Sequence, residues 1–499
     1  MVGEQQHDSG CWRLRREAPV APSIAPLTRP STCRMGLKQR LWLLLVALLL
    51  SLASPARAET AAGTESETQS QPQPPPEPLV PSETQPRTQT QAISLLDAAR
   101  LAITVGDLKT ARDILTIALE REPGSVDARF LMGEVESRAG NFQAAVGYYR
   151  QILVDHPELV RVRLDLARAL FELKDDETAT YHFQLALAAP DLPATVIDNV
   201  HAYLAAIRQR KRYAITLQVG LAPDSNLNAA PAASQVTLFG LPFTLTQASR
   251  PHSGVGLAVT SGGEYYAPIA TDLRWRAGAS SYAIEYPGNS AFNDAQLRLG
   301  MGPQWLVGRG DVSVLAVAAK RWFGNDPYNV GYGGRIEGGQ PVTDRVRLEG
   351  YVEGLTLGYH SQTFLDGYSL YAVLFSTYGL TSSSFIRLIT GVGTEQTQSA
   401  FFTNHSVRLG MAYQQDFPWG VTGYVEPNVV VAQYDEDNIA FGKRRHDVLS
   451  SVRLSLNKRD IALFGFSPVF SYTYSRDQSD IDFFSFVRHQ FELGATRYF

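Results

Sequence analysis

Residues 407–414 read Val407-Arg408-Leu409-Gly410-Met411-Ala412-Tyr413-Gln414, with an apolar side chain at every second position. Successive side chains of a β-strand point to opposite faces, so this stretch predicts a strand with one apolar face and one polar or small face. Residues 346–353 and 448–456 repeat the scheme. An apolar row facing lipid and a polar row facing a lumen are typical of a membrane β-barrel. A soluble β-sandwich also alternates and is the alternative interpretation.

Fourteen alternating segments can be counted between residues 213 and 499. Their connections alternate between short turns and longer polar loops, as in outer-membrane barrels, whose short turns lie in the periplasm. The sequence therefore predicts a 14-stranded antiparallel transmembrane β-barrel over residues 213–499, with both ends of the barrel on the periplasmic side. The strands are predicted to begin near Tyr213, Ser253, Asp272, Asp294, Gly310, Tyr328, Arg345, Gly367, Ser383, Thr403, Val421, Arg445, Ala462 and Phe484.

The last predicted strand, residues 486–499, ends the chain on an aromatic residue. It resembles the terminal signal that barrel-assembly machinery reads, and Glu492, Gly494 and Phe499 match that signal. Arg497 departs from it, because an apolar residue is expected there. The resemblance implies that barrel-assembly machinery is a partner during biogenesis.

The first 58 residues predict a secretory signal in an unusual place. A basic segment begins at Met35, an apolar run of 12 residues follows over 41–52, and Ala56-Arg57-Ala58 forms an A-x-A cleavage site. We interpret residues 1–58 as an over-called start plus a signal peptide, with Met35 as the true initiator and cleavage after Ala58. An extended signal peptide is the alternative. Residues 59–91, rich in Pro and Gln, predict a disordered linker.

The composition of the predicted mature chain excludes several classes of function. Cys11 and Cys33 both precede the cleavage site, which leaves no disulfide, thiolate metal site or acylated N-terminal cysteine. Eight of the 45 basic and three of the 49 acidic residues are also lost, so 37 basic and 46 acidic residues remain. A net charge near −9 (37 minus 46) argues against nucleic-acid binding. No catalytic motif and no metal-ligand spacing is found, so we predict no enzyme activity, cofactor or metal.

A repeat with a period of 34 residues begins at residue 92. Small residues recur where two helices would pack closely, and a turn position recurs between the helices; the aligned sets are Ala99, Gly133 and Ala167; Ala111, Ala145 and Ala179; and Gly106, Gly140 and Lys174. This pattern resembles the tetratricopeptide repeat. We predict an N-terminal α-helical solenoid of three such repeats, capped by a helix over residues 197–210, in a domain spanning residues 92–212.

The resemblance to tetratricopeptide repeats implies a concave groove lined by the first helix of each repeat. The groove residues that we expect to contact a client are Arg100, Phe130, Glu134, Arg138, Arg161, Arg168, Phe171 and Glu172. In the barrel, strand phase places a second set of charged residues on the polar face: Arg298, Arg347, Glu349, Glu353, Arg387, Arg408, Arg453 and Glu492. These lumen candidates either line a path or brace one another.

The order of signal, repeats and barrel resembles the surface lipoprotein assembly modulator family, called Slam. The resemblance covers residues 92–499 and includes the segment 224–228 after the first strand and the closing run 470–494. It implies an outer-membrane translocator, with its repeats in the periplasm, that moves client lipoproteins or secreted proteins across the membrane. The implied partners are the client, a periplasmic chaperone and outer-membrane lipid. A polysaccharide exporter of similar architecture, or a barrel enzyme or porin, is the alternative.

Overall fold

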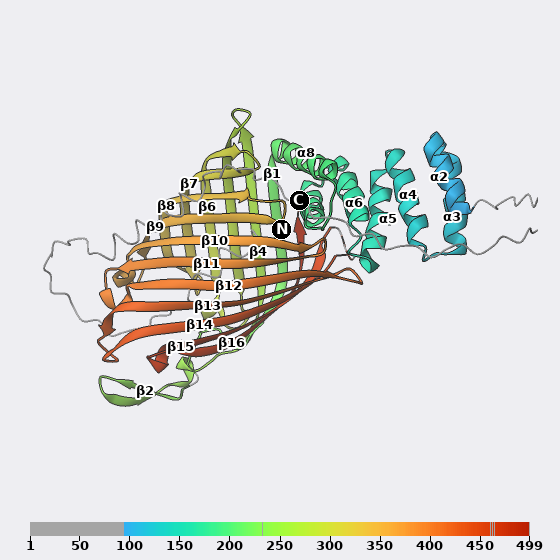
Figure 1. Cartoon of the computed structure of the whole chain (residues 1–499). Helices are drawn as coiled ribbons and strands as arrows, with labels where there is room; N and C mark the ends of the chain where they lie inside the picture. The colour runs from blue at the N-terminus through green and yellow to red at the C-terminus, as the bar shows by residue number, and fades with distance from the viewer. Residues whose placement is uncertain (1–93, 232, 460, 462, 464, 499) are drawn as a thin grey trace, which may run out of the picture. The chain divides into compact units, whose positions relative to one another are not determined.

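The computed structural model describes residues 94–499, except residues 232, 460, 462, 464 and 499 and the side chains of residues 248 and 498. The predicted signal, its cleavage site at Ala56 and Ala58, the linker and Phe499 lie outside the described residues. The described chain consists of a helical domain followed by a closed β-barrel (Figure 1).

Seven helices form the described part of the helical domain. They are α2 (Leu95–Val105), α3 (Leu108–Arg121), α4 (Val126–Arg138), α5 (Phe142–Asp155), α6 (Val160–Glu172), α7 (Asp176–Leu187) and α8 (Ala194–Arg210). Consecutive helices pair into three repeats, and α8 follows as the additional helix. The expected tetratricopeptide-repeat solenoid is confirmed.

Local sequence explains where these helices start and stop. The side chain of Ser94 accepts a hydrogen bond from the Asp97 amide, and Ser125 does the same for Ala128, as N-capping residues do. Gly106 and Gly140 end the first helices of two repeats in the left-handed conformation, with φ of 83° and 80°. Lys174, at the aligned position of the third repeat, has a φ of 62°. The repeat thus keeps the backbone turn even where glycine is lost.

Small residues at the aligned positions form the core of the repeats. Each of the following is fully buried: Ala99, Ala111, Ala145, Ala167 and Ala179. At Gly133, a Cβ would lie 2.5 Å from the ring of Tyr149, so the helix pair has no room for a side chain there. The 34-residue period therefore records a packing requirement. No helix among the described residues has the length and apolar character needed to cross a membrane.

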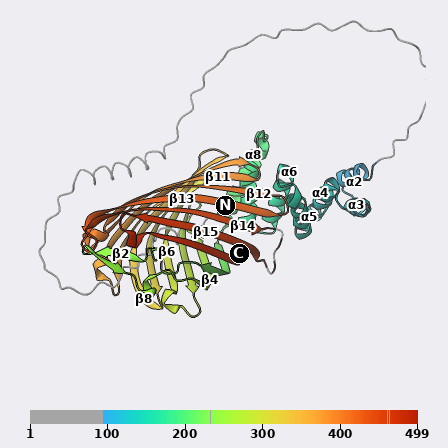
Figure 2. The same cartoon turned by 90° about the horizontal axis from the view of Figure 1, so that it is seen from below.

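Fourteen antiparallel strands form the barrel; each is paired with the next barrel strand along the chain, and β1 is paired with β16. Figures 1 and 2 show the barrel in two views. They are β1 (Tyr213–Asp224), β4 (Gly254–Pro268), β5 (Leu273–Glu285), β6 (Asp294–Val307), β7 (Gly310–Phe323), β8 (Asp326–Pro341), β9 (Val346–Tyr359), β10 (Gly367–Thr381), β11 (Ser384–Thr397), β12 (Asn404–Phe417), β13 (Val421–Asn438), β14 (Lys443–Lys458), β15 (Ser467–Ser479) and β16 (Phe486–Tyr498). The predicted 14-stranded antiparallel barrel is confirmed. A separate hairpin, β2 (Gln235–Leu238) and β3 (Leu241–Thr244), lies in the loop after β1.

The two faces of the barrel strands differ as the alternation predicts. In β12, Leu409 is 57% exposed, whereas its neighbour Arg408 is 5% exposed. The apolar row therefore faces outward, where lipid belongs, and the polar row faces the interior. One strand begins later than expected, at Ser467 rather than near Ala462, because the chain first turns at Gly465 with a φ of 81°.

Candidate functional site

The barrel encloses a cavity of about 1190 Å³. Its wall consists mainly of inward-facing side chains of the barrel strands, and residues of α7 and α8 also line it. A cavity of this size is the natural candidate site, because it is bounded both by the inner wall of the barrel and by the last two helices of the helical domain.

Six of the eight lumen candidates line this cavity: Arg347, Glu349, Arg387, Arg408, Arg453 and Glu492. The other two, Arg298 and Glu353, form an ion pair with each other. Their inward direction agrees with strand phase, because Leu297 and Leu299 on either side of Arg298 are exposed. The structure therefore places all eight on the inner face of the barrel, while their part in moving a client stays a prediction.

The charges of the inner wall are largely paired with one another. Arg347 Nε lies 2.5 Å from Glu349 Oε1, and Arg408 Nη2 lies 3.5 Å from Glu426 Oε1. Arg387 donates to the hydroxyl of Thr377 at 2.8 Å. Pairing offsets the desolvation of buried charge. The lining of the cavity carries both signs, with 15 basic and nine acidic residues.

A second group of paired charges lies on the inner wall, and most of its members are not among the residues predicted from strand phase. Arg276 forms ion pairs with both Glu264 and Glu337, and Glu337 also pairs with Arg335, which in turn lies 3.5 Å from Glu353. The group bridges four strands, β4, β5, β8 and β9. The alternation of Arg274 and Arg276 with Trp275 in the sequence indicates that both arginines face inward. Their partners on other strands cannot be identified without the strand register.

The helices contact the barrel at its short connections. Arg208 of α8 donates to the carbonyl oxygens of Gly308 and Gly310 at 2.6 and 3.2 Å. His201 of α8 lies 2.7 Å from Asp344, which also accepts from Arg309 at 2.8 Å. These bonds connect α8 to the β6–β7 and β8–β9 turns.

Two further short connections contact earlier parts of the helical domain, α5 and the turn that follows it. Ser382, between β10 and β11, donates to the carbonyl of Glu158 at 3.0 Å. Gly420, between β12 and β13, donates to the carbonyl of Val154 at 3.3 Å. The repeat domain is thus attached to the short-turn end of the barrel. The chain passes from α8 into β1 at the same end.

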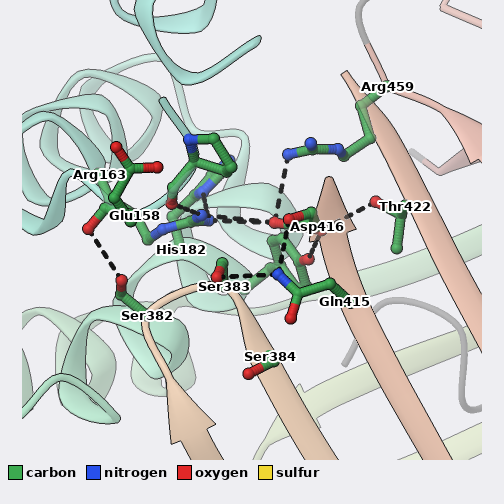
Figure 3. Close-up of polar contacts among 12 residues, drawn as sticks. Glu158, Arg163, His182, Ser382, Ser383, Ser384, Gln415, Asp416, Thr422 and Arg459 are labelled. Carbon is green, nitrogen blue, oxygen red and sulfur yellow. Dashed lines mark hydrogen bonds and ion pairs between the residues drawn. The ribbon is translucent and has the colours of Figure 1, made fainter. Parts of the chain in front are cut away.

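A fully buried ion pair forms the centre of this attachment (Figure 3). Arg163 of α6 places Nη1 and Nη2 each 3.4 Å from Asp416 Oδ2, at the end of β12. Arg459, which follows β14, also reaches Asp416 Oδ2 at 3.2 Å. The hydroxyl groups of Tyr181 and Thr422 both donate to Asp416 Oδ1 at 2.9 Å. One carboxylate therefore connects two helices with three barrel segments.

The guanidinium of Arg163 is held on its other side by the repeats. Nη2 donates to the carbonyl of Pro157 at 2.5 Å, and Nη1 lies 3.1 Å from Nδ1 of His182. Burial lowers the pKa of His182 well below its usual value, and the positive charge of Arg163 lowers it further. His182 is therefore neutral, and its Nδ1 accepts the hydrogen bond from Arg163. Burial also lowers the pKa of Arg163, while Asp416 opposes that effect.

The groove candidates lie on the first helices of the repeats, and most of their charges have partners nearby. Arg138 pairs with Glu134 at 2.7 Å, and Arg100 lies 3.3 Å from Asp97 and 3.9 Å from Asp127. Arg161 and Arg168 both approach Asp165, at 3.7 and 3.4 Å. Glu172 is exposed at the end of α6.

The two aromatic groove candidates are more structural than expected. Phe130 packs against the repeat core, 5.9 Å from the ring of Tyr149, and the guanidinium of Arg161 lies 5.4 Å from its centroid. Phe171 packs edge-on against Tyr203 of α8, and Arg210 lies 3.8 Å from its centroid. Both side chains are half-buried, so each can present only part of its ring to a client.

Within the predicted assembly signal, Glu492 and Gly494 lie in β16. Gly494 is paired with Gly220 of β1, and Glu492 accepts a hydrogen bond from Gln218. These two residues thus contribute to the closure of the barrel, whereas Phe499 is outside the described residues. Their recognition by assembly machinery stays a prediction.

Comparison with known proteins agrees with this architecture. Surface lipoprotein assembly modifier 1 of Neisseria meningitidis serogroup B is 26% identical over 236 residues, covering 47% of each chain. A surface lipoprotein assembly modifier 1 of Haemophilus influenzae is 22% identical over 370 residues, covering 72% of this chain and 75% of that protein. Hemophilin secretion modulator of Acinetobacter baumannii is 22% identical over 390 residues, covering 74% and 78%. The chain spans about half the length of the first of these relatives.

Two family models match the two parts of the chain separately. The model described as the N-terminal tetratricopeptide repeats of the surface lipoprotein assembly modifier matches residues 128–183, within α4 to α7. The model of the surface lipoprotein assembly modifier itself matches residues 213–499, which is the whole barrel and more than half of the chain. The chain therefore belongs to the surface lipoprotein assembly modifier family.

Proposed function

We propose that the protein is an outer-membrane translocator that moves client proteins, surface lipoproteins or related secreted proteins, to the cell surface. The repeats, on the periplasmic side, engage the client or a chaperone that carries it. The barrel then provides the path through the membrane. The names of the relatives, which refer to surface lipoprotein assembly and to hemophilin secretion, support this choice of client.

One observation carries the proposal: the cavity of the barrel is lined at its short-turn end by α7 and α8, the last two helices of the helical domain. A client bound along the first helices would be released beside this entrance. The wall carries both signs and contains ion pairs such as Arg347–Glu349 and Arg408–Glu426, which suits an unfolded polypeptide that carries both charges. The outer membrane offers no ATP, so binding at one end and folding outside must drive the movement.

The proposal is tested by co-expressing the full chain with a candidate lipoprotein encoded beside its gene. Protease accessibility on intact cells measures how much client reaches the surface, with total client held equal. We expect exposure only when the full chain is present. Equal exposure in cells that lack the protein would contradict the proposal.

A further inference from the structure

The barrel is closed by a seam between β1 and β16 that differs from its other seams. Among the described residues, the ladder of this seam pairs seven residues of each strand, between Thr216↔Tyr498 and Asp224↔Gln490. Every other pair of neighbouring barrel strands is paired over eleven to fifteen residues. Each backbone group unpaired in lipid is costly, so the seam with the shortest ladder is the least costly to open.

Side chains close the outer end of this seam, where the ladder is interrupted after Leu221. Arg488 Nε lies 3.0 and 2.9 Å from the two carboxylate oxygens of Asp224, and the pair is buried. Gln490 donates to the same carboxylate at 3.2 Å. Ser225 exchanges hydrogen bonds with the backbone of His489, at 3.0 and 2.8 Å. We call these residues the seam lock.

The seam lock explains two stretches that the sequence singles out. Residues 224–228, just after the first strand, supply one side of the lock, and residues 487–490 of the closing run supply the other. Asn226 extends the lock by donating to the carbonyl of Val487 at 3.1 Å. Two segments more than 260 residues apart thus meet at one place, where a few bonds replace the strand ladder that is interrupted after Leu221.

Between the seam lock and the short-turn end, the outward face of the seam is apolar and its inward face is polar. Gly220 faces Gly494, and a Cβ on Gly494 would lie 2.3 Å from the carbonyl oxygen of Val219, so no side chain separates the strands there. The outward row, which includes Leu221 and Leu493, is apolar and exposed. The cavity reaches the seam from inside, because Gln218, Asp224 and Glu492 line it. At this seam, a single closed strand pair therefore separates the polar interior from the apolar outer face.

We propose that the β1–β16 seam opens sideways and lets the acyl chains of a lipidated client pass from the cavity into the outer leaflet. This inference rests on the proposed function. Acyl chains gain free energy by leaving a polar cavity for lipid, whereas the polypeptide of the client belongs in water. The seam lock at the outer end holds the barrel closed until the lipid anchor arrives.

A disulfide across the seam tests this inference. The predicted mature chain contains no cysteine, so Val219→Cys with Ala495→Cys, at paired positions of β1 and β16, introduces the only pair. The matched control is Val352→Cys with Ala372→Cys, another paired valine and alanine on β9 and β10. The probes are the neighbouring-gene lipoprotein and its variant without the acylated cysteine. Assembly of each barrel is verified by heat-modifiable gel migration.

We expect the oxidised seam variant to reduce surface exposure of the lipidated probe to the background of cells without the protein. A reducing agent should restore it, and the control disulfide should have no effect. The unlipidated probe should cross in every variant. Export of the lipidated probe by the oxidised seam variant at the control level would overturn the inference. Equal loss of both probes would also overturn it, since the disulfide would then block the path of the polypeptide as well.

Failure of the proposed function is distinguishable, because in that case the unmodified protein would export neither probe. A second measurement needs no client. Asp224→Asn removes the charge that Arg488 faces, so hydrogen exchange of residues 217–224 should become faster in the full protein, relative to the β9–β10 pair. Unchanged exchange would contradict a lock at this seam.

Discussion

The arginines of the repeat helices are held in two very different ways. Arg100, Arg138 and Arg168 lie on the exposed side of the first helices, each near a carboxylate of the same helix or of the next first helix. Arg163, only five residues before Arg168, is completely buried against Asp416 of the barrel. Exposed ion pairs contribute little to stability and exchange partners easily, whereas a buried pair is costly to break. The exposed set suits recognition of a client, and the buried pair suits attachment of the repeats to the barrel.

Breaking the buried pair should have the largest effect on stability. Arg163→Ala leaves the carboxylate of Asp416 with Arg459 as its ion-pair partner among the described residues, and removing one partner of a buried pair typically costs about 3–5 kcal/mol. We expect the helices to melt earlier in the full chain in detergent, as followed by circular dichroism. The control is Arg161→Ala on the same helix, whose side chain is exposed and which should change little. Equal effects of the two variants would contradict the distinction between the exposed arginines and the buried Arg163.

Overpacking the repeat core should have the next largest effect. Ala145 is fully buried between helices of the second repeat, so Ala145→Trp should cost on the order of 1–3 kcal/mol. Ala144, its exposed neighbour in α5, provides the matched control, Ala144→Trp. Thermal melting of the helices in the full chain measures both. Melting that does not respond to Ala145→Trp would mean that the aligned small residues do not set the helix spacing.

Acidification should weaken the buried attachment more than the exposed face. The folded protein keeps His182 neutral because its pKa is lowered by burial, while the pKa of an unfolded histidine is about 6.5. Below that pH the unfolded chain binds a proton that the folded chain does not, so stability falls as pH decreases. His182→Gln retains a hydrogen-bond acceptor without titrating and should flatten this dependence. If the stability of the two proteins depended on pH in the same way, His182 would not be the group that causes the loss of stability at low pH.

Reversing the exposed charges should have the smallest effect on stability and a visible effect on export. Arg100→Glu, Arg138→Glu and Arg168→Glu together should shift melting little, because exposed pairs are each typically worth under about 1 kcal/mol. Client exposure at the surface should nevertheless decrease if groove charges steer the client. Full export by the triple variant would remove these arginines from the recognition surface.

Most of the fold could be predicted from local patterns in the sequence. Alternation such as that of residues 407–414 and the 34-residue period are requirements of packing, so they remain visible in one chain. The inward direction of Arg408 or Arg453 follows from strand phase alone.

The attachment site could not be predicted in this way. Arg163 and Asp416 are separated by 253 residues. The repeat pattern places Arg161 in the groove, but nothing in it indicates that Arg163 contacts a carboxylate of the barrel. The partners of Arg276 and the residues of the seam lock depend on strand register and on the closure of the barrel. Such contacts between distant segments are settled by tertiary structure, and local periodicity carries no record of them.

Removing the repeats tests the central claim, that the repeats deliver a client to the barrel, most directly. Deletion of residues 92–206, with the signal and barrel retained, is compared with the full chain at equal amounts of assembled barrel. Surface exposure of the neighbouring-gene lipoprotein is measured by protease accessibility on intact cells. We expect an inserted barrel that exports its client poorly. Full export by the truncated barrel would contradict it and would place client selection in the cavity or the outer loops.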